Sequence, residues 1–122
     1  MALFTVTTNS YVNQPPTQVG NGAAETDYGV AYVFSVSDFT TLTTPAYSDP
    51  EGDSAYQLKV TGLPSTGVLK LSGSNVTLNQ IINFTSISSG LLTYVPDNGT
   101  TTEYDDTFNF EIADSGSQQF VG

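Results

Sequence analysis

Apolar and polar side chains alternate along much of this chain, so that every second residue is apolar. The segment 30–36 places valine and aromatic side chains on one face of an extended chain, and 108–112 does the same with phenylalanine and isoleucine. Because successive side chains of a β-strand point to opposite faces, this period predicts half-buried strands. No window has the apolar spacing of a full-length helix, and we expect only one helical turn, around residues 79–86.

Turn-forming residues divide the chain at short intervals. Clusters of Gly, Pro, Asn, Asp and Ser stand at 13–16, 20–22, 49–53, 64–67, 72–75, 88–90 and 96–99. Short strands between closely spaced turns are typical of an antiparallel sandwich or small barrel. We therefore expect an all-β, antiparallel sandwich or small barrel with an N-terminal extended arm. About seven strands are predicted, near residues 3–8, 29–37, 55–63, 67–72, 75–79, 91–95 and 106–113.

The Asn-Gln-Pro-Pro run at 13–16 predicts a boundary. Residues 1–12 form a separate N-terminal arm, and 13–122 form the sandwich. The arm carries alternating residues that can pair as an edge strand, in this chain or with a neighbour. The arm residues that we expect to bind a partner are Leu3, Phe4, Thr5 and Val6.

The C-terminal side of the sandwich is short of a strand. After the strand predicted at 106–113, the sequence offers a turn at 114–117 and then only residues 118–122. An unprotected sheet edge is an association site. We therefore expect the sandwich to lack its last strand, which further chain or an outside strand would supply.

Charge and missing residue types exclude most chemistry. The 122 residues carry 12 Asp and Glu against 2 Lys and Arg, a net charge of −10, with no Cys, His or Trp. Zinc fingers, iron–sulfur clusters, thiol nucleophiles and Ser–His triads are therefore excluded. Two lysines cannot neutralise a row of phosphates, so we expect no nucleic-acid partner and no membrane surface as partner. The N-terminus has none of the features of a secretion signal.

Acidic turns supply the candidate metal site. Asp49, Glu51 and Asp53 place carboxylates at alternate positions of one turn, and hard cations bind several oxygen ligands at once. Calcium is the one cofactor that we consider. Other acids that can converge on this turn from other loops are Glu25, Asp27, Asp97, Asp105, Asp106 and Asp114. The competing interpretation is a solvated acidic turn, since Asp folds turns without any ion.

No catalytic residue is predicted. Asp105 and Asp106 are adjacent, so on a strand they point to opposite faces and cannot act on one glycosidic bond. Lys59 and Lys70 lie between core-facing positions and therefore point outward, away from any buried isopeptide partner. We expect a protein that is not an enzyme.

Five blocks occur in an order that resembles a known repeat. They are Asp-Pro-Glu-Gly-Asp at 49–53, Leu-x-Val at 58–60, Leu-Pro-x-x-Gly-x-Leu-x-Leu at 63–71, Gly-x-Leu-x-Tyr-x-Pro at 90–96 and Asp-x-Phe-x-Phe-x-Ile-x-Asp at 106–114. This order resembles the cadherin-like, Ig-like repeats of bacteria and phages, and is similar to the repeat of chondroitin sulfate proteoglycan ectodomains. The resemblance implies an all-β, antiparallel, Ig-like or cadherin-like β-sandwich. The resemblance covers about residues 13–114; the arm has no counterpart in it.

The resemblance also bears on the metal site. In such repeats the equivalents of Asp49, Asp53 and the final acid, Asp114, often sit near calcium between domains. The expected ligands are therefore Asp49, Glu51, Asp53 and Asp114.

An acidic, Cys-free domain without an export signal resembles phage virion accessories. We expect a non-enzymatic structural or interaction protein, such as a capsid decoration, head-fibre or tail-associated protein, on the virion surface after assembly in the host cytoplasm. Its arm would bind a capsid or tail protein, or neighbouring copies in a homo-oligomer. The alternative is a calcium-rigidified module of a bacterial surface adhesin, on the cell surface. A third interpretation is a carbohydrate-binding accessory domain of an enzyme; the sequence identifies no glycan receptor.

Overall fold

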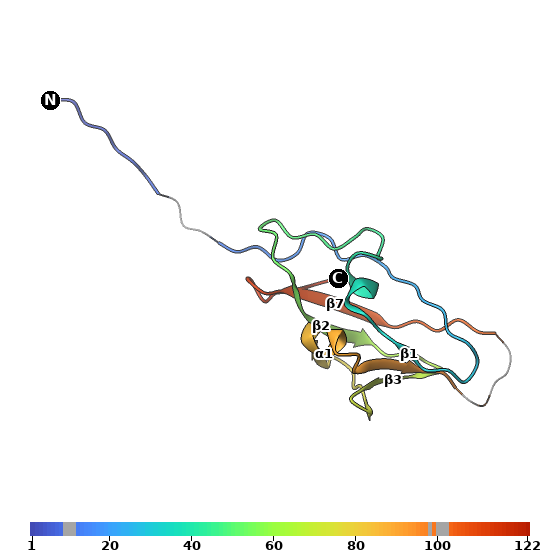
Figure 1. The fold of residues 1–122 in the computed structure, drawn as a ribbon. Helices are drawn as coiled ribbons and strands as arrows, with labels where there is room; N and C mark the ends of the chain where they lie inside the picture. Colours follow the sequence, from blue (N-terminus) through green and yellow to red (C-terminus); the bar gives the residue numbers. More distant parts are fainter. Residues whose placement is uncertain (9–11, 98, 100–102) are drawn as a thin grey trace.

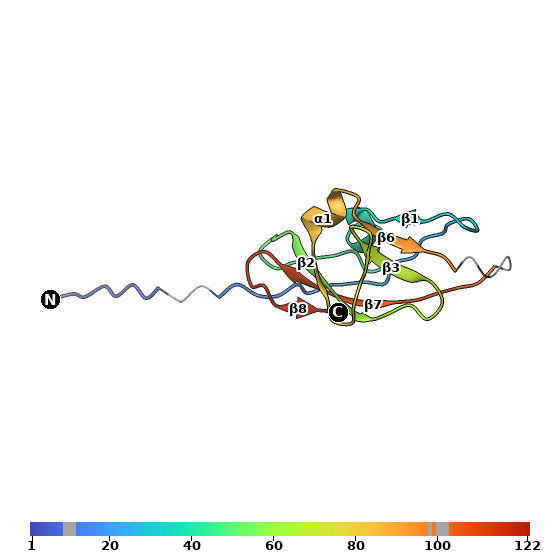
Figure 2. The ribbon, with the colours of Figure 1, turned by 90° about the horizontal axis from the view of Figure 1, so that it is seen from below.

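The computed structural model describes residues 1–8, 12–97, 99 and 103–122, and most of its regular structure belongs to two antiparallel sheets (Figures 1 and 2). The first sheet has the order β1 (Tyr32–Val33), β6 (Leu92–Val95), β3 (Val68–Leu71), β4 (Ser74–Asn75). The second has the order β5 (Ile81–Asn83), β2 (Ala55–Gly62), β7 (Asn109–Asp114), β8 (Phe120–Val121). Two helical segments are short: the 3-10 helix η1 (Val36–Phe39) and α1 (Phe84–Ser88). The predicted all-β class is confirmed.

Both sheets contribute to one hydrophobic core. Leu58 and Val60 of β2, Leu92 of β6 and Ile112 of β7 have no exposed surface. Burial on β2 falls on alternate residues, as the period of two predicts. Phenylalanine rings extend the core by edge-to-face contacts, with ring centroids 5.8 Å apart for Phe34 and Phe108.

Several predicted strands correspond to strands of the structure, and others do not. The strands predicted at 55–63, 67–72, 91–95 and 106–113 overlap β2, β3, β6 and β7. The strand predicted at 29–37 shrinks to β1, because the Ser35 N–H donates to Asp38 (2.9 Å) and the chain turns into η1. The strand predicted at 75–79 ends at Asn75, and the chain turns at Asn79, which has φ 63°. The helical turn predicted at 79–86 lies later, at α1.

The segment after Asp114 returns to the sheet. It turns and forms β8, in which Val121 pairs with Ile112 and Phe120 with Ala113 of β7. The sequence analysis expects no strand here, because two residues are too few to show a period. Lys59, between the buried Leu58 and Val60, holds its ammonium nitrogen 4.4 Å from the Phe120 ring centroid. This cation–π contact supports the short strand.

The arm and the loop end of the sandwich lie at opposite ends of the molecule (Figure 1). Residues 1–8 extend away from the sheets and form no strand within this chain, while 9–11 lie outside the described residues. The side chains of Leu3, Phe4 and Val6 are 88%, 89% and 74% exposed. Among the described residues, no helix has the length and apolar character that crossing a membrane requires.

Candidate metal centre

Four carboxylates meet where the arm joins the sheets. Asp49, Glu51 and Asp53 belong to the turn before β2, and Asp114 is the last residue of β7. The pairing of Ala55 with Asp114 brings the two segments together. One carboxylate oxygen from each acid lies within 4.8 Å of the others. These are the four acids that the sequence analysis selects, and we call them the acidic cluster.

The turn is folded around one oxygen of Asp49. Its Oδ1 accepts the N–H of Glu51 at 2.9 Å and of Asp53 at 3.1 Å. Gly52, with φ 75°, donates its N–H to the Asp49 carbonyl at 3.1 Å. A non-glycine residue would be strained at that φ. Local turn chemistry therefore positions the Asp49 carboxylate.

Asp114 is positioned by the turn that follows it. Its side chain has no exposed surface, and its Oδ1 accepts the N–H of Ser117 at 2.8 Å and of Gln118 at 3.1 Å. The Ser117 hydroxyl donates to the same oxygen. One oxygen of this carboxylate is thus fully engaged within its own loop.

The remaining oxygens of these two acids are buried and lack partners. Neither Asp49 Oδ2 nor Asp114 Oδ2 has a hydrogen-bond partner among the described residues. A buried carboxylate oxygen without a donor costs free energy unless a proton or cation compensates it. The cluster therefore holds two acceptors that point to such a compensating group.

Burial and their mutual contact shift the pKa values of Asp49 and Asp114. Burial raises the pKa of Asp49, and the adjacent Asp114 raises it further, against the opposing N–H donors of Asp53 and Glu51. Burial also acts to raise the pKa of Asp114, but the Ser117 hydroxyl, the interaction with Asp49 and the N–H donors of Ser117 and Gln118 outweigh it and hold this pKa below its usual range. The pKa values of these two neighbouring carboxyl groups are therefore shifted in opposite directions.

The cluster also holds the root of the arm. Asn13 donates its side-chain N–H to Asp53 Oδ2 at 2.7 Å, and the Gln14 N–H donates to Glu51 Oε1 at 3.1 Å. The acidic cluster therefore holds residues 13 and 14, at the start of the domain, against the turn at 49–53.

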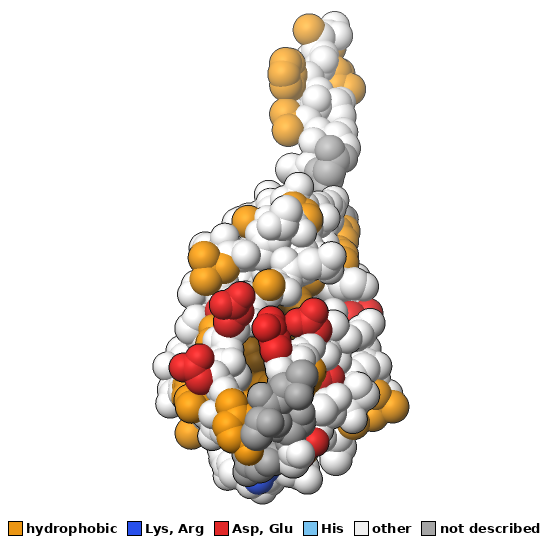
Figure 3. Space-filling view, turned by 90° about the vertical axis from the view of Figure 1, so that its right-hand side faces the viewer, with side chains coloured by type: hydrophobic (Ala, Val, Ile, Leu, Met, Phe, Trp, Pro, Cys, Tyr) orange, Lys and Arg blue, Asp and Glu red, His pale blue; other side chains and the backbone are white. Residues whose placement is uncertain are grey.

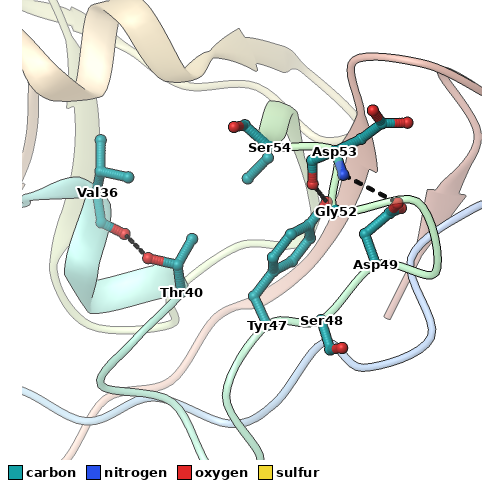
Figure 4. Close-up of a pocket in the computed structure, with 9 residues that line it drawn as sticks. Val36, Thr40, Tyr47, Ser48, Asp49, Gly52, Asp53 and Ser54 are labelled. Atoms are coloured by element: carbon teal, nitrogen blue, oxygen red, sulfur yellow. Dashed lines mark hydrogen bonds between the residues drawn. The ribbon is translucent and has the colours of Figure 1, made fainter.

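A shallow pocket of about 480 Å³ lies beside this turn (Figure 4). The Tyr47 hydroxyl donates to the Asp53 carbonyl at 3.1 Å along its wall. Burial raises the pKa of Tyr47, and the charges of Asp49, Asp114 and Asp53 raise it further, so the phenol stays neutral. The rest of the lining comprises Asp49 and Asp53 of the cluster together with Val36, Thr40, Ser48, Gly52, Ser54 and Ala55.

The other acids do not join the cluster. Glu25, Asp27 and Asp105 line a groove at the opposite end of the domain, together with Asp106. Asp97 accepts the N–H of Gly99 in its own loop at 2.9 Å. Of the acids proposed from other loops, Asp114 alone is brought to the turn at 49–53.

Asp106 has a structural role that the sequence analysis does not predict. Its carboxylate accepts the N–H groups of Ser65 (3.1 Å), Thr66 (3.2 Å) and Gly67 (2.7 Å). The Tyr94 hydroxyl adds a fourth bond at 2.8 Å. The carboxylate of Asp106 therefore closes the turn between β2 and β3 from about 40 residues away along the chain. A contact at such a separation produces no local sequence pattern from which it could be predicted.

Comparisons with known proteins return nothing: no family model, no curated protein and no solved structure matches this chain. The resemblance to cadherin-like repeats therefore rests on the order of the sequence blocks.

Proposed function

We propose that this chain is a non-enzymatic attachment and display protein, in the manner of a phage virion accessory on a capsid or tail, anchored by its N-terminal arm. The observation that carries the proposal is the arm itself. Residues 1–8 extend from the domain with Leu3, Phe4 and Val6 almost fully exposed. Exposed main-chain groups next to alternating apolar side chains suit strand addition to a partner's sheet edge.

Charge distribution supports this division of roles. The 12-residue arm contains no Asp, Glu, Lys or Arg, while every acid lies between Glu25 and Asp114. Main-chain pairing and apolar burial need no charge complementarity, so the arm suits a sheet edge of either sign. The high negative charge of the sandwich discourages association between the displayed domains.

Removal of residues 1–8 is expected to abolish attachment without unfolding the domain. The described arm residues make no strand pairing with the sandwich, so the melting temperature should stay within about 2 °C. The measurement is electron microscopy of the native assembly, comparing the particle-bound density of full-length and shortened chains. Deletion tests the whole arm.

Two matched variants separate the sources of affinity. The triple substitution Leu3→Ser, Phe4→Ser, Val6→Ser removes apolar burial but keeps the main chain. Thr5→Pro removes one main-chain donor but keeps the apolar side chains. Both are expected to weaken attachment, whereas Ala2→Ser should leave it unchanged. Full attachment of the shortened chain would refute anchoring by the arm.

A second candidate function is a calcium-rigidified module of a bacterial surface adhesin, and the acidic cluster favours it. The residues fit a hard cation: four carboxylates supply oxygen only, and two of those oxygens are buried and without hydrogen bonds. Calcium prefers oxygen ligands from carboxylates, carbonyls and water. Calcium here would join the turn at 49–53, the end of β7 and the root of the arm into one stiff joint.

Calcium is expected to raise the melting temperature. A ligand present at about 100 times its Kd stabilises the folded state by ~2.7 kcal/mol. For a domain of this size, such stabilisation corresponds to a shift of roughly 8–15 °C. Scanning calorimetry in EDTA and in millimolar calcium measures the shift.

The variant that tests the cluster is Glu51→Gln, which retains the oxygen that accepts the Gln14 N–H but removes one charge from the cluster. This variant should lose most of the calcium shift and keep its melting temperature in EDTA. Magnesium should act weakly, because it demands a tighter octahedral geometry. An unchanged melting temperature in calcium would leave the cluster as a solvated turn.

A further inference from the structure

A groove of about 1200 Å³ opens at the end of the sandwich opposite the arm (Figure 3). Its walls are the loop 22–30 and the segment 103–107. The aromatic side chains lining it include Tyr32, Phe34, Tyr94, Tyr104 and Phe108. Figure 3 shows this apolar floor between acidic side chains.

Half of the chain's 12 acids line this groove. They are Glu25, Asp27, Asp38, Glu103, Asp105 and Asp106. Neither of the two lysines is among the lining residues. The groove is therefore a concentrated negative field over an aromatic surface, without a cation of its own.

Two of these acids are engaged in the fold. Asp38 accepts the Tyr32 hydroxyl and the Ser35 N–H, both at 2.9 Å to Oδ2. Asp106 closes the turn at 65–67 as described above. The other four, Glu25, Asp27, Glu103 and Asp105, are exposed along the rim. Rim carboxylates of this kind attract a positively charged ligand and raise its association rate.

One strand that lines the groove, β1, is an edge strand of its sheet. Within the described part of the chain, β1 is hydrogen-bonded to β6 on one side only. On the other sheet, β8 pairs with β7 at Ile112 and Ala113, and Gly122 lies against the Phe110 carbonyl, so β1 is the open edge beside the groove. Open strand edges offer main-chain donors and acceptors to an extended peptide.

We propose that this groove binds an extended segment of a partner protein in which lysine or arginine alternates with apolar side chains. The basic side chains would pair with the rim carboxylates and lie over the phenol rings, and the main chain would pair with an open edge. The proposal goes beyond attachment by the arm and does not depend on it. The arm leaves the domain at the end opposite the loops 22–30 and 103–107 (Figure 1).

Charge complementarity selects this partner over two others. The arm of a second copy has no basic side chain, and it would bring another net charge of −10 to the groove. A neutral glycan can stack on tyrosine but leaves four exposed carboxylates uncompensated. Only a cationic ligand satisfies the aromatic floor and the acidic rim together.

The test uses the full chain, labelled with nitrogen-15, and a capped decapeptide that alternates arginine with tyrosine or valine. Amide resonance shifts are expected in 22–34 and 103–108 and not in 49–53. Raising the salt from about 50 to 500 mM should weaken binding ~10-fold, because exposed charges are screened beyond a few ångströms at high ionic strength. A control peptide with citrulline in place of arginine should bind at least about tenfold more weakly.

Matched variants exclude binding by net charge alone. Asp105→Asn in the rim and Glu111→Gln outside the groove each remove one negative charge. The rim variant should weaken peptide binding about 2–5-fold, the size of an exposed ion pair, and the control by much less. Equal losses in both variants, or equal binding of the citrulline peptide, would overturn the proposal.

Two further results would also overturn it. Groove shifts caused by neutral oligosaccharides but not by the arginine peptide would assign the surface to glycans. Groove shifts that depend on protein concentration without peptide would assign it to a second copy. Neither outcome bears on the arm, whose function is measured separately on the native assembly.

Discussion

Replacing Asp106 with alanine is expected to destabilise the domain by about 2–4 kcal/mol. The carboxylate accepts the N–H groups of Ser65, Thr66 and Gly67 and the hydroxyl of Tyr94. Alanine leaves these donors without their acceptor; the half-exposed ones regain water, but Gly67 is buried. Asp105→Ala is the matched control, because the adjacent acid is exposed and should change stability by less than about 0.5 kcal/mol.

The effect of Asp106 should depend on pH in a defined direction. Burial acts to raise its pKa, but the donors from Gly67, Tyr94, Ser65 and Thr66 outweigh burial and hold the pKa below its usual 3.8. An acid whose pKa is lowered by folding stabilises the folded state fully above its unfolded pKa, and this contribution disappears as pH falls through the folded pKa. Chemical denaturation of wild type and Asp106→Asn should therefore show their largest difference at neutral pH, shrinking below about pH 4. A difference that grows on acidification would contradict this assignment.

The same turn shows what the sequence does and does not predict. A positive φ is expected from the sequence at Gly52, Gly67 and Gly90, and the structure has φ 75° and 76° at the first and last. Gly67 is required for a different reason: an added Cβ would lie 2.4 Å from atoms of the Tyr94 ring. That contact joins β3 to β6, so no local pattern reveals it.

Strand prediction succeeds where alternation is long and one face is buried. β2 has eight residues and buries Leu58 and Val60 with Lys59 between them facing outward, which gives a clear signal. β1 and β8 have two residues each and lie at sheet edges, where little burial is available to impose a period. Near β1 the alternation continues to Val36, but the Ser35 N–H donates to the Asp38 carboxylate and the backbone turns into η1.

The acidic cluster is predictable only as a set of residue types. Alternate acids in one turn select Asp49, Glu51 and Asp53, and the resemblance adds Asp114. The distribution of donors is not predictable. One oxygen each of Asp49 and Asp114 accepts hydrogen bonds, while the other oxygen of each carboxylate is buried without one. This arrangement results from two loops that fold against each other.

Replacing Asp49 with asparagine is expected to stabilise the calcium-free protein. The asparagine oxygen can still accept the N–H groups of Glu51 and Asp53, and its new amide can donate to Asp114 Oδ2, which has no hydrogen-bond partner among the described residues. The melting temperature in EDTA should therefore rise by roughly 3–6 °C, because the buried Oδ2 of Asp114 gains a hydrogen bond. In calcium the variant should gain much less than wild type, because a carboxylate ligand is lost.

The pH dependence identifies the cause of this stabilisation. Burial, and then Asp114, raise the pKa of Asp49. A raised folded pKa gives stability that is present below the unfolded pKa and is lost as pH rises through the folded pKa. In EDTA, the melting temperature of wild type should therefore fall relative to Asp49→Asn as pH rises from about 4 toward 7.

Glu103→Gln removes the same charge at an exposed position of the opposite end and should leave both the pH dependence and the calcium shift intact. If Asp49→Asn lowers the melting temperature in EDTA, the carboxylates of Asp49 and Asp114 do not destabilise the calcium-free protein by repulsion, which contradicts the assignment of a cation site. If the cluster binds calcium, Asp49→Asn should raise the melting temperature in EDTA and reduce the rise that calcium causes. Both effects have one cause, because the negative charge of Asp49 that binds the ion also repels Asp114 when no ion is bound.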